Sequence, residues 1–359
     1  MSLPLPNFVA TLAQLPEFDE VIDVRSPAEF ADDHIPGAIN CPVLDDAERA
    51  RVGTIYKQVS PFEARKVGGA LVARNIARHL EEKFHDRPKS WRPLIYCWRG
   101  GQRSGAMTLV FSQVGWAARQ LEGGYKGYRR EVLRRLEEEP GRFRYRLLCG
   151  PTGSGKTALL KAIAAQGGQA LDLEGLARHK GSVLGVLPGE AQPSQKRFES
   201  LLAAQLATFD PAKPVCVESE SKTVGNLRVP PALFAAMRAA EPVLLEVPFA
   251  ERVAFLLRDY DYFLENPAWL GERLDRVVEL HGKETVARWR GLIAAGAWEA
   301  LVESLLADHY DPAYRRAQQR DFARREGGTV IRLTRLNPDE LAEAASSLLD
   351  IAKPPHGPG

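Results

Sequence analysis

The sequence predicts two consecutive α/β domains, each built on a parallel sheet, with an almost wholly helical insertion in the second. Three observations predict this fold class. The chain has 359 residues, a length for which two domains are the natural expectation. Apolar strand patterns alternate with helical patterns in both halves, as in parallel sheets covered by helices. A charged segment closed by Pro140-Gly141 separates the two sets of strands.

The first domain is expected over residues 1–138. Its strands are predicted at 18–24 and 92–97, with a last short strand and turn in 117–124. Apolar residues at helical spacing predict helices at 73–84 and 104–116. The charged segment 126–146 then reads as a surface helix at the domain boundary.

The second domain is expected over residues 139–359. Its strands are predicted in 144–150, 169–174, 214–219, 242–247 and 329–333. Between about 249 and 326 the pattern is helical and reads as an insertion near the end of the sheet. The tail 351–359 is rich in proline and glycine, and we expect it to be disordered.

The composition excludes several classes of protein. With 45% hydrophobic and 26% charged residues, the chain is expected to be a globular protein, and its net charge of +2 neither demands nor excludes a nucleic-acid partner. The N-terminus does not resemble a secretory signal and no apolar stretch is long enough to cross a bilayer, so we expect a cytoplasmic protein without a membrane partner. Four widely spaced cysteines argue against disulfides or a zinc cage. Of these, Cys41, Cys149 and Cys216 are expected to be inert and buried.

Cys97 is the candidate nucleophile of the first domain. It ends a predicted strand, and a helix is expected to begin after six further residues. Backbone N–H groups of this loop, including those of Gly100 and Gly101, would wrap around a point above the sulfur and stabilise an anion there. Because Arg99 and Arg103 add positive charge, the loop should favour the thiolate over the thiol.

A second loop, Gly150–Thr157, matches the phosphate-binding pattern G-x-x-x-x-G-K-[ST] in full. It follows an apolar strand and precedes a helix, the context in which this pattern is specific. Lys156 supplies a point charge, and the hydroxyl of Thr157 is placed for Mg²⁺ if a metal is used. The predicted phosphate-binding residues are Gly150, Gly153, Ser154, Gly155, Lys156 and Thr157. The pattern indicates a di- or triphosphate-like ligand and leaves open which one.

An acidic partner for this loop is expected at the end of the strand 214–219. Glu218 and Glu220 stand there, at the edge where open α/β sheets bind ligands. Asp172 and Glu174, near the end of another predicted strand, compete for the role. Aspartate is the more usual partner at such a loop, so glutamate leaves diphosphate binding and ATP hydrolysis equally open.

The segment 177–185 places His179, Lys180, Gly181 and Ser182 in a loop after a strand end. Such a loop can deliver a base or an anion ligand to the site, and His179 and Ser182 are therefore auxiliary candidates. A plain surface turn is the equal alternative.

A basic segment follows at 314–325. Its arginines at helical spacing are Arg315, Arg316, Arg320, Arg324 and Arg325. A solvated basic face and a contact with an RNA backbone are the two interpretations. The aromatic residues in this region are Trp289, Trp298, Tyr310 and Tyr314. They favour RNA, since bases stack on aromatic side chains, although helix packing accounts for some of them.

The N-terminal half resembles the rhodanese family. The resemblance is carried by VIDVRSPAEFADDHIPGAIN (21–40), YCWRGGQRSG (96–105) and LEGGYKGYR (121–129). Rhodaneses carry a persulfide on the loop cysteine, and by analogy sometimes selenium, which implies this role for Cys97. Cys97 and Arg103 also have the C-x5-R spacing of cysteine phosphatases, in which Arg103 would clamp a phosphoryl group. Tyr96 stands where those enzymes have histidine, so phosphatase is the minor alternative.

The ordered combination of motifs resembles the bacterial tRNA 2-selenouridine synthase family over about residues 15–335. The segments that carry it are DVRSPAEF, CWRGGQRSG, GPTGSGKT, the HKGS loop, the ESES strand end and HYDPAYRRA. The resemblance implies a rhodanese-like domain followed by a P-loop NTPase-like domain. It also implies a transferase that acts on the wobble 2-thiouridine of tRNA with geranyl diphosphate and selenophosphate as co-substrates. The sulfur would be geranylated first, and selenium would then displace geranylthiol.

This resemblance suggests a division of labour between the two loops. Lys156 and Thr157 would bind the diphosphate of geranyl diphosphate, and Cys97 would carry or deliver selenium. Two other classes stay open: an ATP-dependent tRNA sulfurtransferase, and a nucleotide-sensing adaptor with a degenerate rhodanese domain. The intact Cys97 loop argues against the adaptor.

Overall fold

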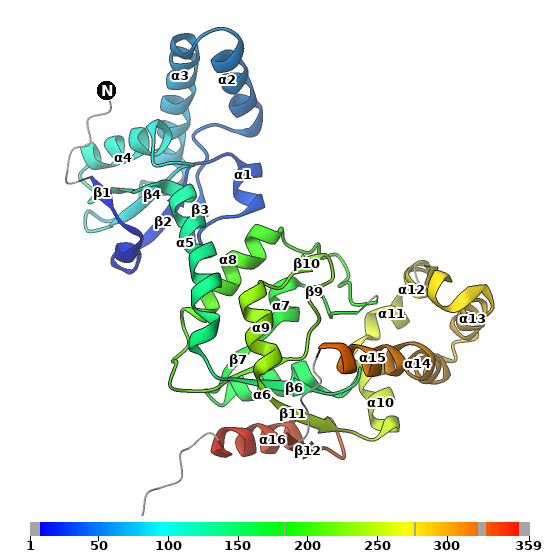
Figure 1. Cartoon of the computed structure of the whole chain (residues 1–359). Coiled ribbons are helices and arrows are strands. Elements are labelled where there is room, and N and C mark those ends of the chain that lie inside the picture. The colour runs from blue at the N-terminus through cyan, green and yellow to red at the C-terminus, as the bar shows by residue number, and fades with distance from the viewer. Residues whose placement is uncertain (1–7, 183, 276–277, 322–327, 352–359) are drawn as a thin grey trace, which may run out of the picture. The chain divides into compact units, whose positions relative to one another are not determined.

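The computed structural model describes residues 8–182, 184–275, 278–321 and 328–351, so the tail predicted to be disordered lies outside the described residues. Two five-stranded parallel sheets with flanking helices confirm the predicted α/β class (Figure 1). The chain forms two compact units, one of the residues up to Arg135 together with Glu199–Ala204, the other of the remainder. In the described parts of the chain, no helix has both the length and the apolar character needed to span a membrane.

The first unit is built on a parallel sheet with strand order β1-β5-β4-β2-β3. Its strands are β1 (Val9–Ala10), β2 (Glu20–Asp23), β3 (Ile39–Asn40), β4 (Pro93–Tyr96) and β5 (Arg119–Leu121). β4 lies in the middle and is buried along its whole length. The loop that follows β4 therefore starts from the best-packed part of the sheet.

Helices cover both faces of this sheet. They are the 3₁₀ helix η1 (Leu12–Glu17), α1 (Pro27–Asp32), α2 (Asp46–Gln58), α3 (Pro61–His79), the π-helical turn η2 (Leu80–Phe84), α4 (Gln102–Val114) and α5 (Gly124–Glu138). The hairpin of α2 and α3 extends well beyond the predicted helix 73–84. Its first helix buries no residue, so it lacks the apolar stripe by which sequence patterns reveal a helix.

The second unit is built on a parallel sheet with order β12-β11-β6-β8-β7 and a separate antiparallel pair, β9 and β10. The strands are β6 (Tyr145–Cys149), β7 (Gln169–Leu171), β8 (Val215–Glu218), β9 (Thr223–Val224), β10 (Leu227–Arg228), β11 (Glu241–Glu246) and β12 (Thr329–Arg332). The strand predicted over 169–174 is too long. It ends at Leu171, because the side chain of Asp172 accepts the N–H of Gly175 at 2.7 Å and caps a short helix.

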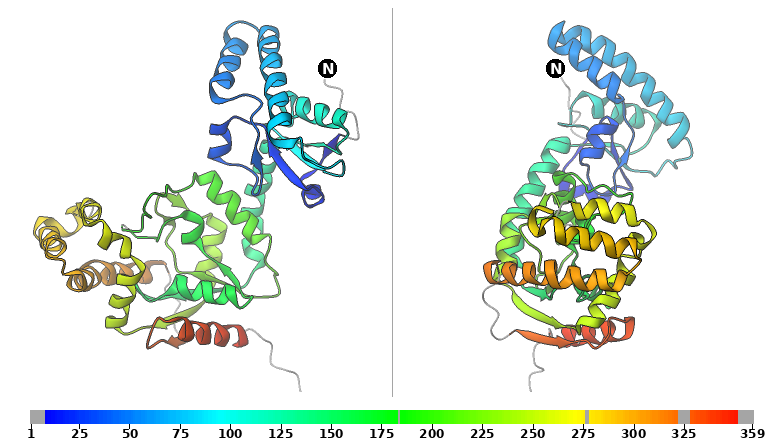
Figure 2. Two further views of the ribbon diagram at one scale, coloured as in Figure 1. Left: turned by 180° about the vertical axis from the view of Figure 1, so that it is seen from behind. Right: turned by 90° about the vertical axis from the view of Figure 1, so that its right-hand side faces the viewer.

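The helices of this unit are η3 (Pro140–Arg142), α6 (Lys156–Ala165), α7 (Leu173–Ala177), α8 (Gln195–Leu206), α9 (Pro231–Ala239), α10 (Phe249–Asp259), α11 (Asp261–Glu265), α12 (Pro267–Leu274), α13 (Val278–Ala294), α14 (Trp298–Leu305), the π-helical turn η5 (Leu306–Tyr310), α15 (Asp311–Asp321) and α16 (Pro338–Ile351). Both α5 and α8 are shared with the first unit. Helices α10–α15, yellow-green to orange in Figure 2, gather beside the sheet. They enclose a core of their own around Trp289.

Candidate active sites

The Cys97 loop holds its sulfur at the bottom of a ring of hydrogen-bond donors. Cys97 follows β4 directly and is only 4% exposed. Its Sγ accepts the backbone N–H of Gly101 at 3.3 Å, which confirms the prediction for Gly101, and the contact predicted for the N–H of Gly100 stays a prediction. The second donor is the hydroxyl of Ser104, 3.1 Å from Sγ, which the sequence did not indicate. Gln120 on β5 donates to that hydroxyl at 2.7 Å and so orients it toward the sulfur.

This environment favours the charged form of Cys97. Burial by itself raises the pKa of the thiol, but the hydrogen bonds from Ser104 and the loop backbone, together with the charge of Arg103, bring the pKa below its ordinary value. By contrast, burial raises the pKa of Cys41 and of Cys216 to about 11. Among the cysteines with a shifted pKa, Cys97 is thus the one poised as a nucleophile.

The segment after β5 supports the loop from below. The backbone N–H of Tyr125 donates to the carbonyl of Cys97 at 2.8 Å, and that of Lys126 donates to Trp98 at 2.9 Å. A Cβ atom at Gly124 would lie 2.3 Å from the Cys97 carbonyl oxygen, and this residue has a φ of 54°. Only glycine fits such a position, which explains the glycines of LEGGYKGYR in physical terms.

Two acidic residues of the first motif hold arginines in place. Asp23 and Arg25 form a fully buried ion pair at 2.6 Å, and the guanidinium of Arg25 lies 4.0 Å from the ring centre of Tyr125. Glu29, on α1, pairs with Arg103 at 2.8 Å. Glu29 therefore holds Arg103 beside the cysteine loop, and a contact of Arg103 with a bound oxyanion stays a prediction.

The phosphate loop has the backbone shape that its sequence predicts. Gly153 and Gly155 have φ values of 81° and 75°, in the region that favours glycine. Lys156 begins α6, and its Nζ donates to the carbonyl of Gly150 at 2.9 Å. Ser154 is fully buried and its hydroxyl has no hydrogen-bond partner among the described residues, so its predicted phosphate contact stays a prediction.

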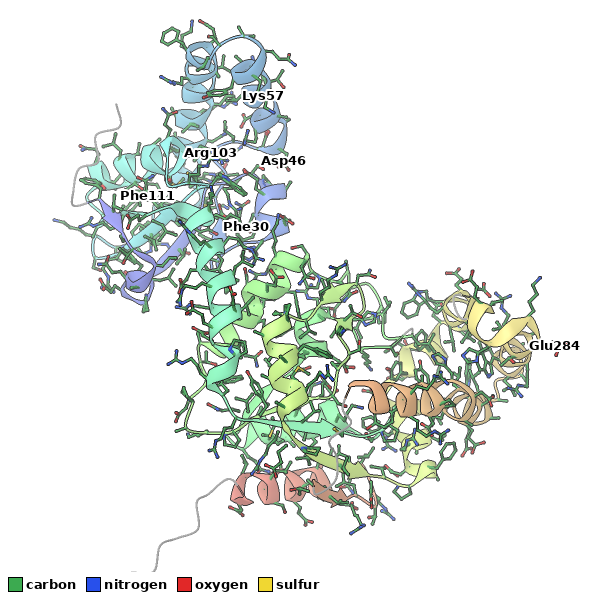
Figure 3. The ribbon with its side chains drawn as sticks, in the orientation of Figure 1. Phe30, Asp46, Lys57, Arg103, Phe111 and Glu284 are labelled. Carbon is green, nitrogen blue, oxygen red and sulfur yellow. The ribbon has the colours of Figure 1, made fainter. Side chains whose placement is uncertain are left out.

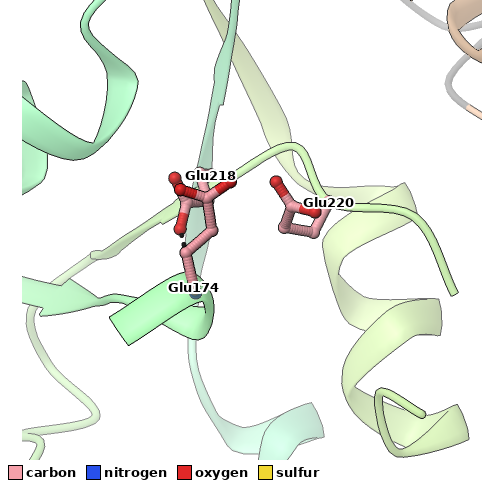
Figure 4. A group of neighbouring side chains, drawn as sticks. All are labelled: Glu174, Glu218 and Glu220. Atoms are coloured by element: carbon pink, nitrogen blue, oxygen red, sulfur yellow. Dashed lines mark hydrogen bonds between the residues drawn. The ribbon is translucent and has the colours of Figure 1, made fainter. Parts of the chain in front are cut away.

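Three glutamates, Glu174, Glu218 and Glu220, lie close together near the phosphate loop (Figure 4). β8 pairs with β6 so that Glu218 lies opposite Leu148, just before the phosphate loop. The Thr157 hydroxyl lies 2.9 Å from a Glu218 oxygen and 3.2 Å from one of Glu174. Carboxylate oxygens of Glu174, Glu218 and Glu220 all lie within 4.8 Å of one another. Glu174 enters this group because the helix α7, unforeseen in the sequence, turns it inward.

The glutamate cluster is short of positive charge. Burial and the repulsion between neighbouring carboxylates raise the pKa values of Glu174, Glu218 and Glu220 above 4.5, and the nearby Lys156 opposes this only in part. Carboxylate oxygens beside a phosphate-loop threonine are the ligands that Mg²⁺ prefers. The residues therefore fit a divalent cation, which would take the place of the protons that the carboxyl groups otherwise retain.

The HKGS loop passes directly over the glutamate cluster. A Cβ atom at Gly181 would lie 2.7 Å from an oxygen of Glu174 and 2.8 Å from one of Glu220, so only glycine allows this approach. The neighbouring Lys180 pairs with Asp259 at 2.8 Å, and both residues line the same cleft as Glu174 and Glu220. The surface-turn alternative for this loop is therefore wrong.

The two auxiliary candidates of this loop face the same space. His179 is 6% exposed, its Nδ1 has no partner among the described residues, and burial lowers its pKa. Its backbone N–H donates to the carbonyl of Glu174 at 3.0 Å. The hydroxyl of Ser182 lies 3.4 Å from that of Tyr310, which links the loop to the helical region.

A buried ion pair ties the helical region to the phosphate loop. Arg252 on α10 donates to the carbonyl of Thr152 at 2.9 Å and pairs with Asp311 at 2.5 Å. Asp311 directly follows His309 and Tyr310 in the HYDPAY segment. This pair therefore fixes both residues next to the loop.

The phosphate loop, Glu174 and Glu220, the HKGS segment and HYDPAY line one cleft of about 610 Å³. The lining residues on which the argument below depends are Lys156, Thr157, Glu174, Glu220, His179, Ser182, Tyr260, His309, Tyr310 and Tyr314. Motifs that are 150 residues apart in the sequence thus form one site. The sequence predicted Lys156, Thr157, Glu220, His179 and Ser182 as site residues. The fold brings them together and adds Tyr260 and His309.

An almost wholly apolar pocket adjoins this cleft. Its volume is about 60 Å³, several times what one water molecule needs. Thr152, Leu256, Tyr260 and Tyr310 line both the pocket and the cleft. The remaining walls come from α11, α12, α14 and η5, with Leu184 of the loop after HKGS. A ligand with a charged end and an apolar end would match this pair of spaces.

Comparison with known proteins agrees with this architecture. Residues 143–273 match the family model described as the tRNA 2-selenouridine synthase AAA domain, and residues 8–131 match the rhodanese-like domain. A tRNA 2-selenouridine synthase of Marinobacter nauticus is 33% identical over 82% of this chain and 87% of its own length. Relatives of the same name from Aeromonas salmonicida and Nitrosomonas europaea are 37% and 35% identical, over 75% and 72% of this chain and 72% and 67% of their own lengths. The chain belongs to the tRNA 2-selenouridine synthase family.

The aromatic residues that sequence reasoning considered for RNA divide into two groups in this family member. Trp289 is fully buried and donates its indole N–H to Ser304 at 2.8 Å, and Trp298 packs against the same helical core. Tyr310 and Tyr314 line the cleft. Helix packing thus accounts for the tryptophans, and the tyrosines remain candidates for contact with a base.

The basic residues are only partly described. Arg315 and Arg316 are exposed on α15. Arg324 and Arg325 lie outside the described residues, as does the side chain of Arg320. Contact between these arginines and RNA stays a prediction.

The contacts that several residues make in the two sites were not predicted from the sequence, although Glu29, Ser104 and His309 stand in the motifs that carry the resemblance. Ser104, Gln120 and Glu29 act on the cysteine loop through contacts between separate elements. Arg252 and His309 join the phosphate cleft in the same way. The HYDPAY segment was among the recognised motifs, but its amino-acid sequence did not indicate which cleft it lines.

Proposed function

We propose that the protein is a cytoplasmic tRNA-modifying transferase that converts the wobble 2-thiouridine to 2-selenouridine. Support comes from relatives that carry the name tRNA 2-selenouridine synthase and from the two candidate sites. The work would be divided between a domain of residues 1–138 and one of residues 139–359. The first would handle selenium from selenophosphate, and the second would transfer a geranyl group from geranyl diphosphate.

The observation that carries this proposal is the apolar pocket that adjoins the phosphate cleft and shares Thr152, Leu256, Tyr260 and Tyr310 with it. Diphosphate oxygens would lie against Lys156 and the backbone N–H groups of the loop. The apolar chain would enter the neighbouring pocket past Tyr260 and Leu256. Enclosing all ten carbons would require α11 and α14, which form the outer wall, to open further. A nucleoside triphosphate, in contrast, makes no use of an apolar pocket at its phosphate end.

In the first reaction, the sulfur of 2-thiouridine attacks the carbon that bears the diphosphate. A carbon–sulfur bond forms, the carbon–oxygen bond breaks, and diphosphate leaves with the electron pair. Lys156 and the loop N–H groups would stabilise the charge that develops on the leaving group. Glu174, Glu218, Glu220 and Thr157 would hold Mg²⁺, which supplies further charge neutralisation when bound.

In the second reaction, selenium replaces the alkylated sulfur. Alkylation makes carbon 2 of the base electrophilic, so a selenium nucleophile can attack it and expel geranylthiol. Selenium is at the selenide level both in selenophosphate and in the product, so no oxidant is required. Cys97, held as a thiolate by Ser104 and Gly101, would attack the phosphorus of selenophosphate, so that a sulfur–phosphorus bond forms and the phosphorus–selenium bond breaks. The hydroselenide ion released in this way would attack carbon 2, and water would then hydrolyse the S-phosphocysteine to phosphate and regenerate Cys97.

Two single variants test this division of labour. Cys97→Ser should keep geranylation and lose selenation, and Lys156→Ala should lose geranylation but still selenate tRNA that is already S-geranylated. Mass spectrometry of the tRNA nucleosides measures both products. Lys213→Ala, in an exposed turn, is the matched control and should behave as wild type. Equal loss of both reactions in both variants would contradict the division, and tRNA-stimulated ATP hydrolysis without use of geranyl diphosphate would indicate a sulfurtransferase.

A further inference from the structure

Two histidines form a hydrogen-bonded pair at the helical wall of the phosphate cleft. Nε2 of His281 on α13 lies 2.7 Å from Nδ1 of His309 in η5. The ring of His281 packs edge-on against the fully buried Trp289, with ring centres 5.2 Å apart. His309 in turn packs against Tyr310 and lines the cleft together with Lys156. The function of the loops and glutamates leaves this pair without a role.

The geometry of the pair determines which nitrogen is available to a ligand. Two ring nitrogens at 2.7 Å require one donor and one acceptor. With the hydrogen on Nδ1 of His309, Nε2 of His281 accepts it, and Nε2 of His309 keeps a lone pair. This is the arrangement by which one group orients a catalytic imidazole through its other nitrogen. Protonation of His309 at Nε2 would leave the hydrogen bond to His281 intact.

The surroundings keep His309 uncharged near neutral pH. Burial is the largest cause that lowers its pKa, and the charges of His281 and Arg316 lower it further. The other charged groups nearby are Arg288 of α13 and Asp308, which pair with each other at 2.7 Å. A neutral imidazole is the form that can accept a proton.

The proposed alkylation releases a proton. When the sulfur of 2-thiouridine forms its bond to carbon, the carbon–sulfur double bond becomes single and a double bond forms between carbon 2 and N3. N3 then loses its hydrogen, so the balanced products are the S-alkylated base, diphosphate and one proton. A base placed near the pyrimidine ring would speed this step.

We propose that His309 is the general base that removes the N3 proton during S-alkylation, and that His281 is the positioning residue that orients it. The proton moves from N3 to Nε2 of His309 and later to solvent. This inference rests on the proposed function of the cleft. His179 is the competing base, but its free Nδ1 leaves its orientation unset and its backbone contacts Glu174. The position of His309 next to the shared wall of cleft and pocket places it near the reacting end of a bound geranyl group.

The experiment is single-turnover geranylation of tRNA that contains 2-thiouridine, followed over a pH series with excess protein. Wild type should show a rate that rises with pH through the pKa of His309 and then levels off. His309→Gln should react about 10²- to 10⁴-fold more slowly at neutral pH. It should also lose the rising limb of the pH–rate curve that belongs to His309, so that its rate rises only as N3 itself ionises. His281→Asn should shift the limb without abolishing it. His85→Gln, at an exposed histidine of the first unit, is the matched control and should be unchanged.

Two further measurements separate the outcomes. Binding of inorganic diphosphate should be the same in wild type and His309→Gln, and added imidazole should restore the rate of His309→Ala. The proposal would be overturned if His309→Gln kept the wild-type rate and pH dependence, or if imidazole did not restore the rate of His309→Ala. It would also be overturned if the rise of the rate with pH disappeared in His179→Gln instead. If wild type forms no S-geranyl product at all, the proposed function itself fails, which is a distinct result.

Discussion

At the scale of single residues, the charge of Cys97 depends on the hydroxyl of Ser104, whose role was not predicted from the cysteine motif. Ser104 lies one helical turn into α4 and donates to Sγ, while Gln120 arrives from β5 to orient it. Hydrogen bonds to a charged group are worth about 1.5–3 kcal/mol each. We therefore expect Ser104 to control the thiolate more strongly than Arg103, whose charge is shared with Glu29.

Ser104→Ala should raise the pKa of Cys97 by about one to two units, because one unit corresponds to about 1.4 kcal/mol. The measurement is the thiolate absorbance of the protein as a function of pH, with Cys97→Ser as the baseline. Ser112→Ala is the control, since its hydroxyl on the same helix donates to the carbonyl of Thr108 at 2.8 Å and not to the sulfur. An unchanged titration in Ser104→Ala would show that the hydroxyl does not set the pKa.

The residue scale also shows where prediction from sequence ends. Gly101, Lys156 and Thr157 belong to contiguous motifs, so their positions follow from local backbone geometry. Ser104 donates to a sulfur seven residues away, and Gln120 reaches it from another strand. Such contacts depend on how elements pack, which a single sequence does not specify.

At the scale of elements, the end of β8 and the start of α7 create the glutamate cluster. The sequence did not predict the start of α7. Apolar and polar residues alternate over part of 169–174 as they do in a strand, whereas the side chain of Asp172 caps a helix there. Glu174 is thereby turned toward Glu218, whose carboxylate accepts the backbone N–H of Glu174 at 3.3 Å. The hairpin of α2 and α3 was missed for the opposite reason, since an exposed helix has too few apolar residues to show its period.

This cluster predicts an inverse dependence of stability on pH in metal-free protein. Because the folded-state pKa values of the glutamates lie above their ordinary value of 4.5, the folded state binds more protons than the unfolded state, and stability falls as pH rises from about 4.5 to the raised values. Each unit of upward shift corresponds to about 1.4 kcal/mol. Mg²⁺ should restore stability most at the alkaline end, as measured by thermal unfolding with and without Mg²⁺.

The matched pair for this prediction is Glu218→Gln and Glu284→Gln. Glu218→Gln should flatten the pH dependence and lose most of the Mg²⁺ effect. Glu284 lies on the outer surface of α13 and its substitution should change neither (Figure 3). A stability that rises with pH in metal-free wild type would contradict the assignment of the cluster.

At the scale of the whole molecule, the chain joins two candidate anion-binding loops, each at the carboxyl end of a central parallel strand. The order of strands and helices made the fold class predictable, because alternation of strand and helix permits few architectures. The helical region was predicted from its sequence pattern, and its part 249–310 was a candidate surface for a geranyl chain, but its contribution to the phosphate cleft was not predicted. Its role emerges from the Arg252–Asp311 pair and the apolar pocket, which join segments far apart in the sequence.

The central claim is that geranylation precedes selenation and that the second unit performs it. The most direct measurement follows the nucleosides of 2-thiouridine tRNA by mass spectrometry, with geranyl diphosphate present and selenophosphate withheld and then added. The account predicts that wild type accumulates S-geranyl-2-thiouridine, which turns into 2-selenouridine after selenophosphate is added, and that Lys156→Ala forms neither. Formation of 2-selenouridine by Lys156→Ala directly from 2-thiouridine, without the geranylated species, would contradict it.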